Sequence, residues 1–160
     1  MAEEEKVPPI LVPVDFSEHS EAALLFAGEL ANCISGSLVV LHVIHDPGDA
    51  PGFYAGRQTK NELKDMEDVA REMMNEFLQK IAEKNPDNLV LGNIEPMLIV
   101  GLPVTRILEA AKKVGARMVV MGSKGRTGLS HVLLGSKAEQ VVRLSPIPVT
   151  IVKANSELNI

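Results

Sequence analysis

The sequence predicts an α/β protein in which an open parallel sheet is covered by helices on both faces, as in Rossmann-like folds. Short apolar runs alternate along the chain with longer segments whose apolar residues recur every three or four positions, the pattern of strands alternating with helices. The first run is apolar throughout, as expected for a strand buried on both faces. The five predicted strands are Ile10–Val14, Leu38–Ile44, Ile94–Val100, Arg117–Met121 and Val149–Val152.

Length and composition indicate a single domain. The chain has 160 residues, 46% of them hydrophobic, which suffices for one continuous core. We expect one domain over residues 1–160 with its core at about residues 8–153. The formal net charge of −5 argues against a nucleic-acid partner. The acidic first residues, the absence of an apolar run of membrane length and the single cysteine predict a cytoplasmic protein with no membrane partner.

The first strand leads into a helix through a polar turn. Asp15 ends the strand, and Ser17 is expected to cap a helix that runs toward Gly36. Cys33 falls within the apolar pattern of this helix, so we interpret it as a core side chain.

A loop and a long amphipathic helix follow the second strand. Two interpretations of Phe53 and Tyr54, in the Pro/Gly-rich loop, remain open: a cover over a ligand or local packing. The helix stripe comprises Leu63, Met66, Ala70, Met73, Phe77 and Ile81, and we interpret its methionines as core. Pro96 falls in the third strand, and Pro103 opens the next helix.

Glycines follow the fourth strand at regular spacing. Gly122, Gly125 and Gly128 come first, and Gly135 precedes a predicted helix that begins at Ser136 and stops before Pro146. Glycines allow a backbone to approach a ligand closely, and a helix N-terminus offers N–H groups and a partial positive charge. Ser136 can cap the helix or donate its hydroxyl, and Lys124 and Lys137 add positive charge. These features suit a phosphate, although three glycines alone also fit a structural turn. The patterns G-x-x-x-x-G-K-[ST] and G-x-G-x-x-G do not fit.

The longer pattern Gly122-x2-Gly125-x9-Gly135-Ser136 resembles the nucleotide-binding signature of the universal stress protein family. The resemblance extends to Val12-Pro13-Val14-Asp15-Phe16-Ser17, Leu41-His42-Val43-Ile44 and Pro146-x-Pro148-Val149, and so covers nearly the whole chain. It implies five strands in the order 3-2-1-4-5, in which strands one and four are neighbours from which the chain winds in opposite directions. Ligands bind at such a switch point, beyond the carboxyl ends of the strands. Asp15 and Gly122 end these two strands and are expected at one crevice.

The resemblance also implies which residues hold the nucleotide. Pro13 and backbone groups of the second strand would enclose the adenine, and the glycine loops would bind ribose and phosphate. The implied binding residues are Pro13, Val14, Asp15, His42, Val43, Gly101, Met121, Gly122, Ser123, Gly125, Gly135, Ser136 and Lys137. Lys137 stands where the family usually has valine. For Asp15, capping of the following helix remains the alternative.

Catalytic and metal-binding patterns are weak. His42 and His45 lie three residues apart on a predicted strand, which places them on opposite faces, so we expect no protein-held metal and Mg²⁺ only through the phosphates of ATP. No G-x-S-x-G elbow occurs, and Gly128-Leu129-Ser130-His131 is not one. We expect a sensor or regulatory protein of the stress response that binds ATP and hydrolyses it slowly or not at all. An ATPase or phosphotransferase, and a nucleotide-free interaction module, remain alternatives. The apolar edge strand at Ile147–Val152 predicts a homodimer.

Overall fold

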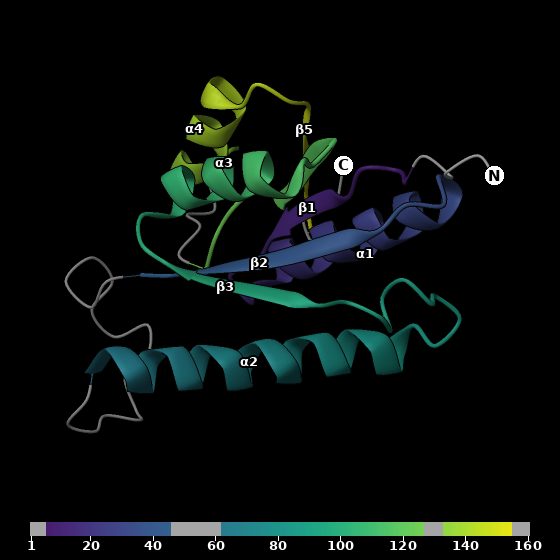
Figure 1. Cartoon of the computed structure of the whole chain (residues 1–160), viewed down its shortest axis with the longest axis horizontal. Helices are drawn as coiled ribbons and strands as arrows, with labels where there is room; N and C mark the ends of the chain where they lie inside the picture. The colour runs from purple at the N-terminus through teal and green to yellow at the C-terminus, as the bar shows by residue number, and fades with distance from the viewer. Residues whose placement is uncertain (1–5, 46–61, 127–132, 155–160) are drawn as a thin grey trace.

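A computed structural model describes residues 6–45, 62–126 and 133–154, with side chains from residue 65 onward in the second range. Strands and helices alternate within these residues (Figure 1). The elements are β1 (Ile10–Pro13), α1 (Glu18–Cys33), β2 (Leu38–Ile44), α2 (Glu62–Lys84), β3 (Pro96–Val100), α3 (Pro103–Val114), β4 (Met118–Gly122), α4 (Ser136–Leu144) and β5 (Val149–Val152). All strand pairs are parallel, and the order β3-β2-β1-β4-β5 confirms the predicted fold class. Phe53, Tyr54, Gly128 and His131 lie outside the described residues.

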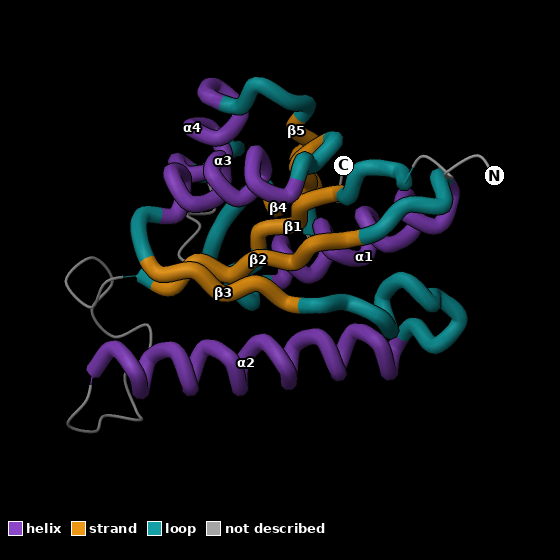
Figure 2. The backbone as a smooth tube through the Cα atoms, in the orientation of Figure 1, coloured by secondary structure: helices purple, strands orange, loops and turns teal. Residues whose placement is uncertain are grey.

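The sheet forms the middle layer of the molecule. Helices α1 and α2 cover one face, and α3 and α4 cover the other (Figures 1 and 2). Successive side chains of β1 point to opposite faces, so Ile10 and Val12 pack with α1 and α2 while Leu11 packs with α3 and α4. Both faces of β1 are therefore buried, which explains its uninterrupted apolar run.

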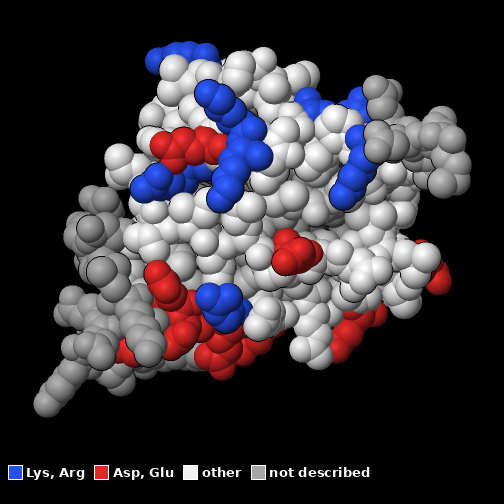
Figure 3. All heavy atoms as spheres, in the orientation of Figure 1, with Lys and Arg blue, Asp and Glu red and all other residues white. Residues whose placement is uncertain are grey.

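Charged side chains are unevenly distributed over the face drawn in Figure 3. Lys and Arg gather over α3 and α4, and Asp and Glu gather over α2. The basic residues in the last turns of these upper helices are Lys112, Lys113 and Arg143. Among the residues that the structure describes, no helix combines the length and the apolar character needed to cross a bilayer.

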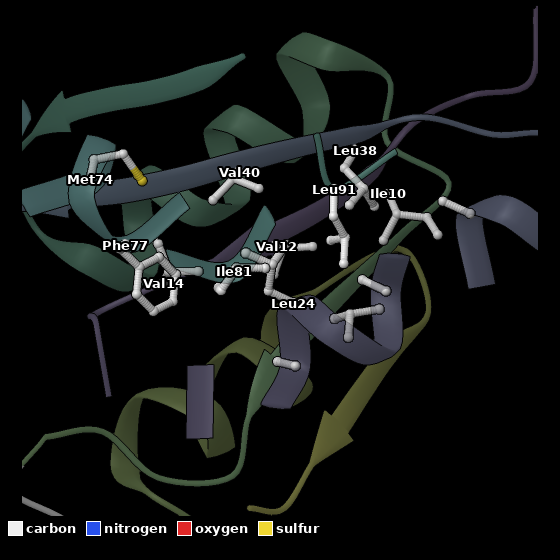
Figure 4. Packing of buried hydrophobic residues seen from close by; sticks show 14 residues of the cluster. Ile10, Val12, Val14, Leu24, Leu38, Val40, Met74, Phe77, Ile81 and Leu91 are labelled. Atoms are coloured by element: carbon white, nitrogen blue, oxygen red, sulfur yellow. The ribbon is translucent and has the colours of Figure 1, made fainter. Parts of the chain in front are cut away.

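The core between the sheet and α2 is built from methionine, phenylalanine and aliphatic side chains. Figure 4 shows Met74, Phe77 and Ile81 of α2 beside Val12 and Val40 of the sheet. Met66 is buried as predicted, but the fully buried methionine is Met74 (0% exposed), and the predicted Met73 is only partly buried. Burial of each large apolar side chain contributes roughly 1.5–3 kcal/mol to stability.

Only the N-terminal end of α1 lies where the sequence predicts it. Ser17 is the N-cap, and its hydroxyl oxygen accepts the N–H of Ser20 at 3.2 Å, as predicted. The helix ends earlier than expected, and Ser35 rather than Gly36 takes the left-handed conformation, with φ of +51°. The assignment of Cys33 to the core is wrong, because its side chain is exposed. It lies about 200° around the helix axis from the buried Ala31, and therefore on the solvent side.

Two prolines lie where the backbone tolerates them. Pro96 begins the edge strand β3, which is shorter than predicted, and at that position its missing N–H costs little. Pro103 is in the first turn of α3, as expected, and Gly115 ends this helix in the left-handed conformation, with φ of +62°. Helix α3 therefore begins where its sequence predicts, and a left-handed glycine ends it.

Candidate functional site

The candidate site lies at the carboxyl ends of β1 and β4, the region where open α/β sheets form their ligand crevice. These strands are paired neighbours, and the chain leaves β1 for α1 on one face and β4 for α4 on the other. This arrangement is the topological switch point at which open α/β sheets bind ligands. The predicted meeting of Asp15 with the glycine loop is confirmed, because a carboxylate oxygen of Asp15 accepts the N–H of Arg126 at 3.0 Å.

The Asp15 carboxylate joins the turn after β1 to the loop after β4. Its Oδ1 accepts the N–H of Ser17 at 3.1 Å, and its Oδ2 accepts the N–H of Arg126. Ser17, not Asp15, caps α1 through its side chain. Gly125 lies so close that an added Cβ would stand 2.9 Å from Oδ2. A side chain at residue 125 would therefore displace either the loop or the carboxylate.

An aromatic cluster packs against the turn that contains Asp15. Phe16 follows it with φ of +66°, an unusual value for a bulky residue. The Phe16 ring lies 4.4 Å from the imidazole of His42 and 5.5 Å, edge-on, from Phe77, measured between ring centroids. This cluster connects β2 and α2 with the turn that contains Asp15.

His42 is a buried histidine, and no role for its side chain was predicted from the sequence. It is 1% exposed, and its Nδ1 lies 2.8 Å from the carbonyl oxygen of Val14. Because a carbonyl oxygen can only accept, Nδ1 carries the proton. Burial lowers the pKa of His42 to about 4, and the bond to Val14 opposes this shift. The signal in the sequence was a histidine within an otherwise apolar strand.

The glycine loop is fixed by backbone contacts with three elements. A Cβ at Gly122 would stand 2.7 Å from the carbonyl carbon of His19, so the first turn of α1 lies directly on β4. Ser123 donates its N–H to Val152 at 2.9 Å and accepts the N–H of Gly135 at 2.7 Å. The two glycine segments, separated in sequence, are thus bonded to one another through Ser123.

His19 is a second buried histidine beside the loop, and sequence reasoning missed it. Its Nδ1 lies 3.4 Å from the backbone N of Ala154 and 3.4 Å from the hydroxyl of Ser123. Since the backbone N–H of Ala154 donates, Nδ1 is the acceptor. His19 therefore connects the start of α1 with the chain after β4 and after β5. No spacing rule predicts contacts across 104 and 135 residues.

The N-terminus of α4 lies beside the glycine loop. Gly135 is the N-cap and no side chain caps the helix, so the interpretation of Ser136 as a cap is wrong. Ser136 and Lys137 are the first helical residues, and both are exposed. Partial removal of water lowers the pKa of Lys137, and the Asp15 carboxylate raises it in part. Lys137 thus interacts electrostatically with Asp15 across the crevice.

Backbone groups of β2 face the crevice from the other side. The last paired residues are Pro13 and Leu41, and β2 continues beyond them to Ile44. The Leu41 carbonyl points toward β1, where it accepts the N–H of Val14 at 2.8 Å. Successive backbone groups of a strand point to alternate sides. The N–H and carbonyl of Val43 therefore point past the end of β1 toward the crevice.

Buried side chains leave only the backbone available at three predicted positions. Val14, Val43 and Met121 are 5%, 6% and 7% exposed, and their side chains pack in the core clusters. Any contact of these residues with a ligand would therefore be made by backbone groups.

Gly101 lies after β3, two strands away from β1. It has φ of +143°, and its N–H donates to Ile44 at 3.0 Å. The side chain of Arg106 covers it, so that a Cβ at Gly101 would stand 2.5 Å from Nε. Arg106 is held there by the carbonyl of Val100 at 3.0 Å and by Glu109 at 2.7 Å. Arg106 is another residue of this region that sequence reasoning missed.

Within residues 6–45, 62–126 and 133–154, no group of three or more His, Cys, Asp or Glu residues could hold a metal ion. The polar groups that the described residues place at the crevice include the Asp15 carboxylate, several backbone N–H groups and the Lys137 ammonium group. Such a set favours an anionic ligand over a bare cation.

The fold and the crevice define a doubly wound α/β protein with a glycine-lined site at its switch point. The sequence profile of the universal stress protein family matches residues 6–153. The chain belongs to this family. It is 30% identical over 154 residues to universal stress protein MJ0577 of Methanocaldococcus jannaschii, covering 90% of this chain and 93% of that one. The solved structure of MJ0577 gives a TM-score of 0.66 at 28% identity, over 91% of this chain and 94% of the other.

Two further structures of this family contain nucleotides. A universal stress protein in complex with cAMP is 25% identical, with a TM-score of 0.62 over 94% of this chain and 99% of that chain. The universal stress protein of Archaeoglobus fulgidus in complex with dAMP is 27% identical, with a TM-score of 0.62 over 92% of this chain and 98% of the other.

Proposed function

We propose that this protein binds an adenine nucleotide, ATP, in the crevice between β1 and β4 and acts as a sensor or regulatory module of the stress response in the cytoplasm. The observation that carries the proposal is the convergence of the Asp15 carboxylate, the loop from Gly122 to Arg126 and the N-terminus of α4 at the switch point. The cAMP and dAMP complexes of two relatives support the choice of an adenine nucleotide.

The phosphates would bind at the glycine loops. Gly135 leads into α4, whose first N–H groups and positive dipole end favour an anion. Ser123 and Gly135 are bonded together, so both glycine segments would meet one phosphate chain. Lys137 adds an ammonium group on the first turn of α4. Mg²⁺ would enter with ATP, held by the phosphates, where it would neutralise part of their charge.

The base and the sugar would bind toward β2. The backbone N–H and carbonyl of Val43 point into the crevice, and an adenine edge offers the complementary acceptor and donor. Pro13 and the backbone of Val14 would close the opposite side, and the Asp15 carboxylate can accept hydrogen bonds from ribose hydroxyls. Asp15 would then exchange its bond to Arg126 for bonds to the nucleotide.

Hydrolysis by the isolated protein would be slow or absent. The groups at the phosphates are backbone N–H groups, hydroxyls and ammonium groups, which bind ground state and transition state alike and so do not accelerate chemistry. Rapid phosphoryl transfer also needs a positioned nucleophile and cations at the developing charge. Asp15, the carboxylate joined to the loop, already accepts two N–H groups. The ATPase or phosphotransferase alternative requires it to orient an attacking water instead.

Two measurements test the proposal. Mass spectrometry of the nucleotide that co-purifies with the protein, together with calorimetric titration with ATP and Mg²⁺, should reveal a bound adenine nucleotide, whereas a nucleotide-free interaction module would bind none. Phosphate release at saturating ATP should take minutes or longer per turnover. Turnover near the roughly 1–100 s⁻¹ of kinases, lost in Asp15→Asn, would instead establish an enzyme.

A homodimer through β5 is the second part of the proposal. Strand β5 lies at the edge of the sheet, and each of its four residues is half-buried. Val142 and Leu144 of α4, the helix that packs beside β5, are 46% and 58% exposed. An apolar strand edge beside exposed apolar side chains favours pairing with a second copy of the chain about a twofold axis.

A further inference from the structure

The turn that carries Asp15 has a conformation that its own sequence disfavours. Phe16 has φ of +66°, in the left-handed region, where a Cβ comes too close to the backbone. Conformations of this kind persist only where the surroundings hold them, and they concentrate at functional sites. Glycine would adopt the same φ without penalty. The groups that hold Phe16 in this conformation therefore also determine the geometry of the site.

One side chain holds the residues on both sides of Asp15. The Nδ1–H of His42 donates to the carbonyl oxygen of Val14, the residue before Asp15, at 2.8 Å. The imidazole ring of His42 also packs on the ring of Phe16, the residue after Asp15, with centroids 4.4 Å apart and planes at 35°. A single residue of β2 thus fixes a backbone group and a ring at the two ends of the turn.

The position of this turn determines what the crevice presents. The carboxylate of Asp15 accepts the N–H of Ser17 at 3.1 Å within the turn and the N–H of Arg126 at 3.0 Å across the crevice. A shift of the turn would therefore move both the carboxylate and the glycine loop. His42 reaches neither group directly and would act through Val14 and Phe16.

We propose that the imidazole of His42 is a positioning residue of the nucleotide crevice, which locks the Val14–Ser17 turn so that the Asp15 carboxylate faces the ligand. The inference rests on the proposed function, because it assigns a role in nucleotide binding. It is distinct from any contact that the backbone of His42 makes with a base. It requires Nδ1 to carry a proton, and the Val14 carbonyl enforces that tautomer.

The first test uses the nucleotide-free protein. His42→Leu removes both the donor and the ring, His42→Phe keeps a ring, and His42→Asn keeps an N–H donor near the position of Nδ1. Amide hydrogen exchange is measured by NMR at Ser17 and Arg126, whose N–H groups bind Asp15, and at Ala110, in the buried face of α3, as a control. We expect His42→Leu to accelerate exchange at Ser17 and Arg126 about tenfold or more while Ala110 is unchanged. The other two variants should lie between Leu and wild type.

The second test is a rescue of nucleotide affinity. His42→Leu should weaken ATP binding about tenfold or more, measured by calorimetry on the full chain with Mg²⁺. Phe16→Gly added to His42→Leu should restore part of the affinity, because glycine takes the required φ without help from His42. If His42 only fills the core, the second substitution removes more packing and affinity falls further. Weaker binding by the double variant than by His42→Leu would overturn the proposal.

The two tests separate failure of the inference from failure of the proposed function. Wild-type protein that binds no ATP would refute the proposed function, while the exchange rates would still show whether His42 fixes the turn. If the amides of Ser17 and Arg126 exchange in His42→Leu at the wild-type rates, the inference is overturned even if the protein binds ATP. If His42→Leu fails to fold, His42→Asn and His42→Phe supply the same comparison.

Discussion

At the scale of single residues, the glycines of the crevice should matter more than any one charged side chain. Gly125→Val and Gly135→Val each place a branched side chain against crowded atoms, Asp15 Oδ2 at 2.9 Å and Ser123 O at 3.3 Å from the new Cβ. We expect both to abolish most ATP affinity while the fold persists, because Gly125 is exposed and Gly135 precedes α4. Lys137→Ala should cost about 1 kcal/mol of binding energy. Calorimetric titration of each variant measures these effects.

A matched control is Gly92→Val. Residue 92 is exposed, and its added Cβ would meet only the carbonyl oxygen of Leu89 at 3.7 Å, so ATP affinity should match that of wild type. The opposite order, with Lys137 dominant and the glycines tolerant, would show that the phosphates do not bind at the loop.

His42 should make stability depend on pH. Burial lowers its pKa from 6.5 to about 4, with a smaller contribution from His45 and Arg126, while Val14 and Asp15 act in the opposite direction. Below pH 6.5 the unfolded chain takes up a proton that the folded protein does not. This contribution to stability is therefore complete above about pH 6.5 and decreases as the pH falls toward 4, by about 3 kcal/mol in all.

Urea unfolding at several pH values between 7 and 5 isolates this effect by comparison with His42→Phe. The difference in free energy of unfolding between wild type and His42→Phe should change with pH in the stated direction. Identical pH profiles for the two proteins would mean that His42 does not stay neutral in the folded state.

At the scale of secondary structure elements, α1 depends on its N-cap. The Ser17 hydroxyl accepts the N–H of Ser20, and both residues are buried, so Ser17→Ala leaves a buried N–H without its acceptor. We expect a loss of about 1 kcal/mol of stability and a decrease in Tm of about 2–4 °C, measured by calorimetry. Ser17→Asp, which keeps an acceptor, should lose less. Equal losses for Ala and Asp would show that capping contributes nothing here.

The elements could be predicted because their signals are local. Strand β2 was predicted at its observed bounds from a run that is apolar except for His42, and α3 was predicted from Pro103 at its start. The meeting of Asp15 with the glycine loop followed from the order of the strands together with the ends of β1 and β4.

The predictions that failed concern residues whose burial or conformation is determined by tertiary contacts. Cys33 fits an apolar pattern, but α1 buries the opposite side. Val14 and His42, 28 residues apart, and His19 and Ser123, 104 apart, are paired by the fold, and nothing local marks them. The left-handed conformation of Phe16 is likewise imposed by its neighbours, because its own sequence disfavours it.

At the scale of the whole molecule, we expect two copies to associate through β5. Ile151→Asp would place a charge in the contact, where its desolvation is costly, so dimerisation should weaken. Analytical ultracentrifugation at micromolar concentration measures the effect. Leu89→Asp, at a residue that is 77% exposed in the loop before β3, adds the same charge elsewhere and should leave the dimer intact. A monomeric wild type would refute this part of the proposal.

The contacts of His19 and Ser123 have a consequence for such a dimer. Ser123 bonds to the backbone of Val152, at the end of β5, and His19 bonds to both Ser123 and Ala154. A ligand that shifts Ser123 would thus also shift the end of β5. Thermodynamic linkage then requires that nucleotide strengthens or weakens dimerisation by the factor by which dimerisation changes nucleotide affinity. ATP titrations below and above the dimer dissociation constant would measure that factor, and the cell's nucleotide level would set how much of the protein is paired.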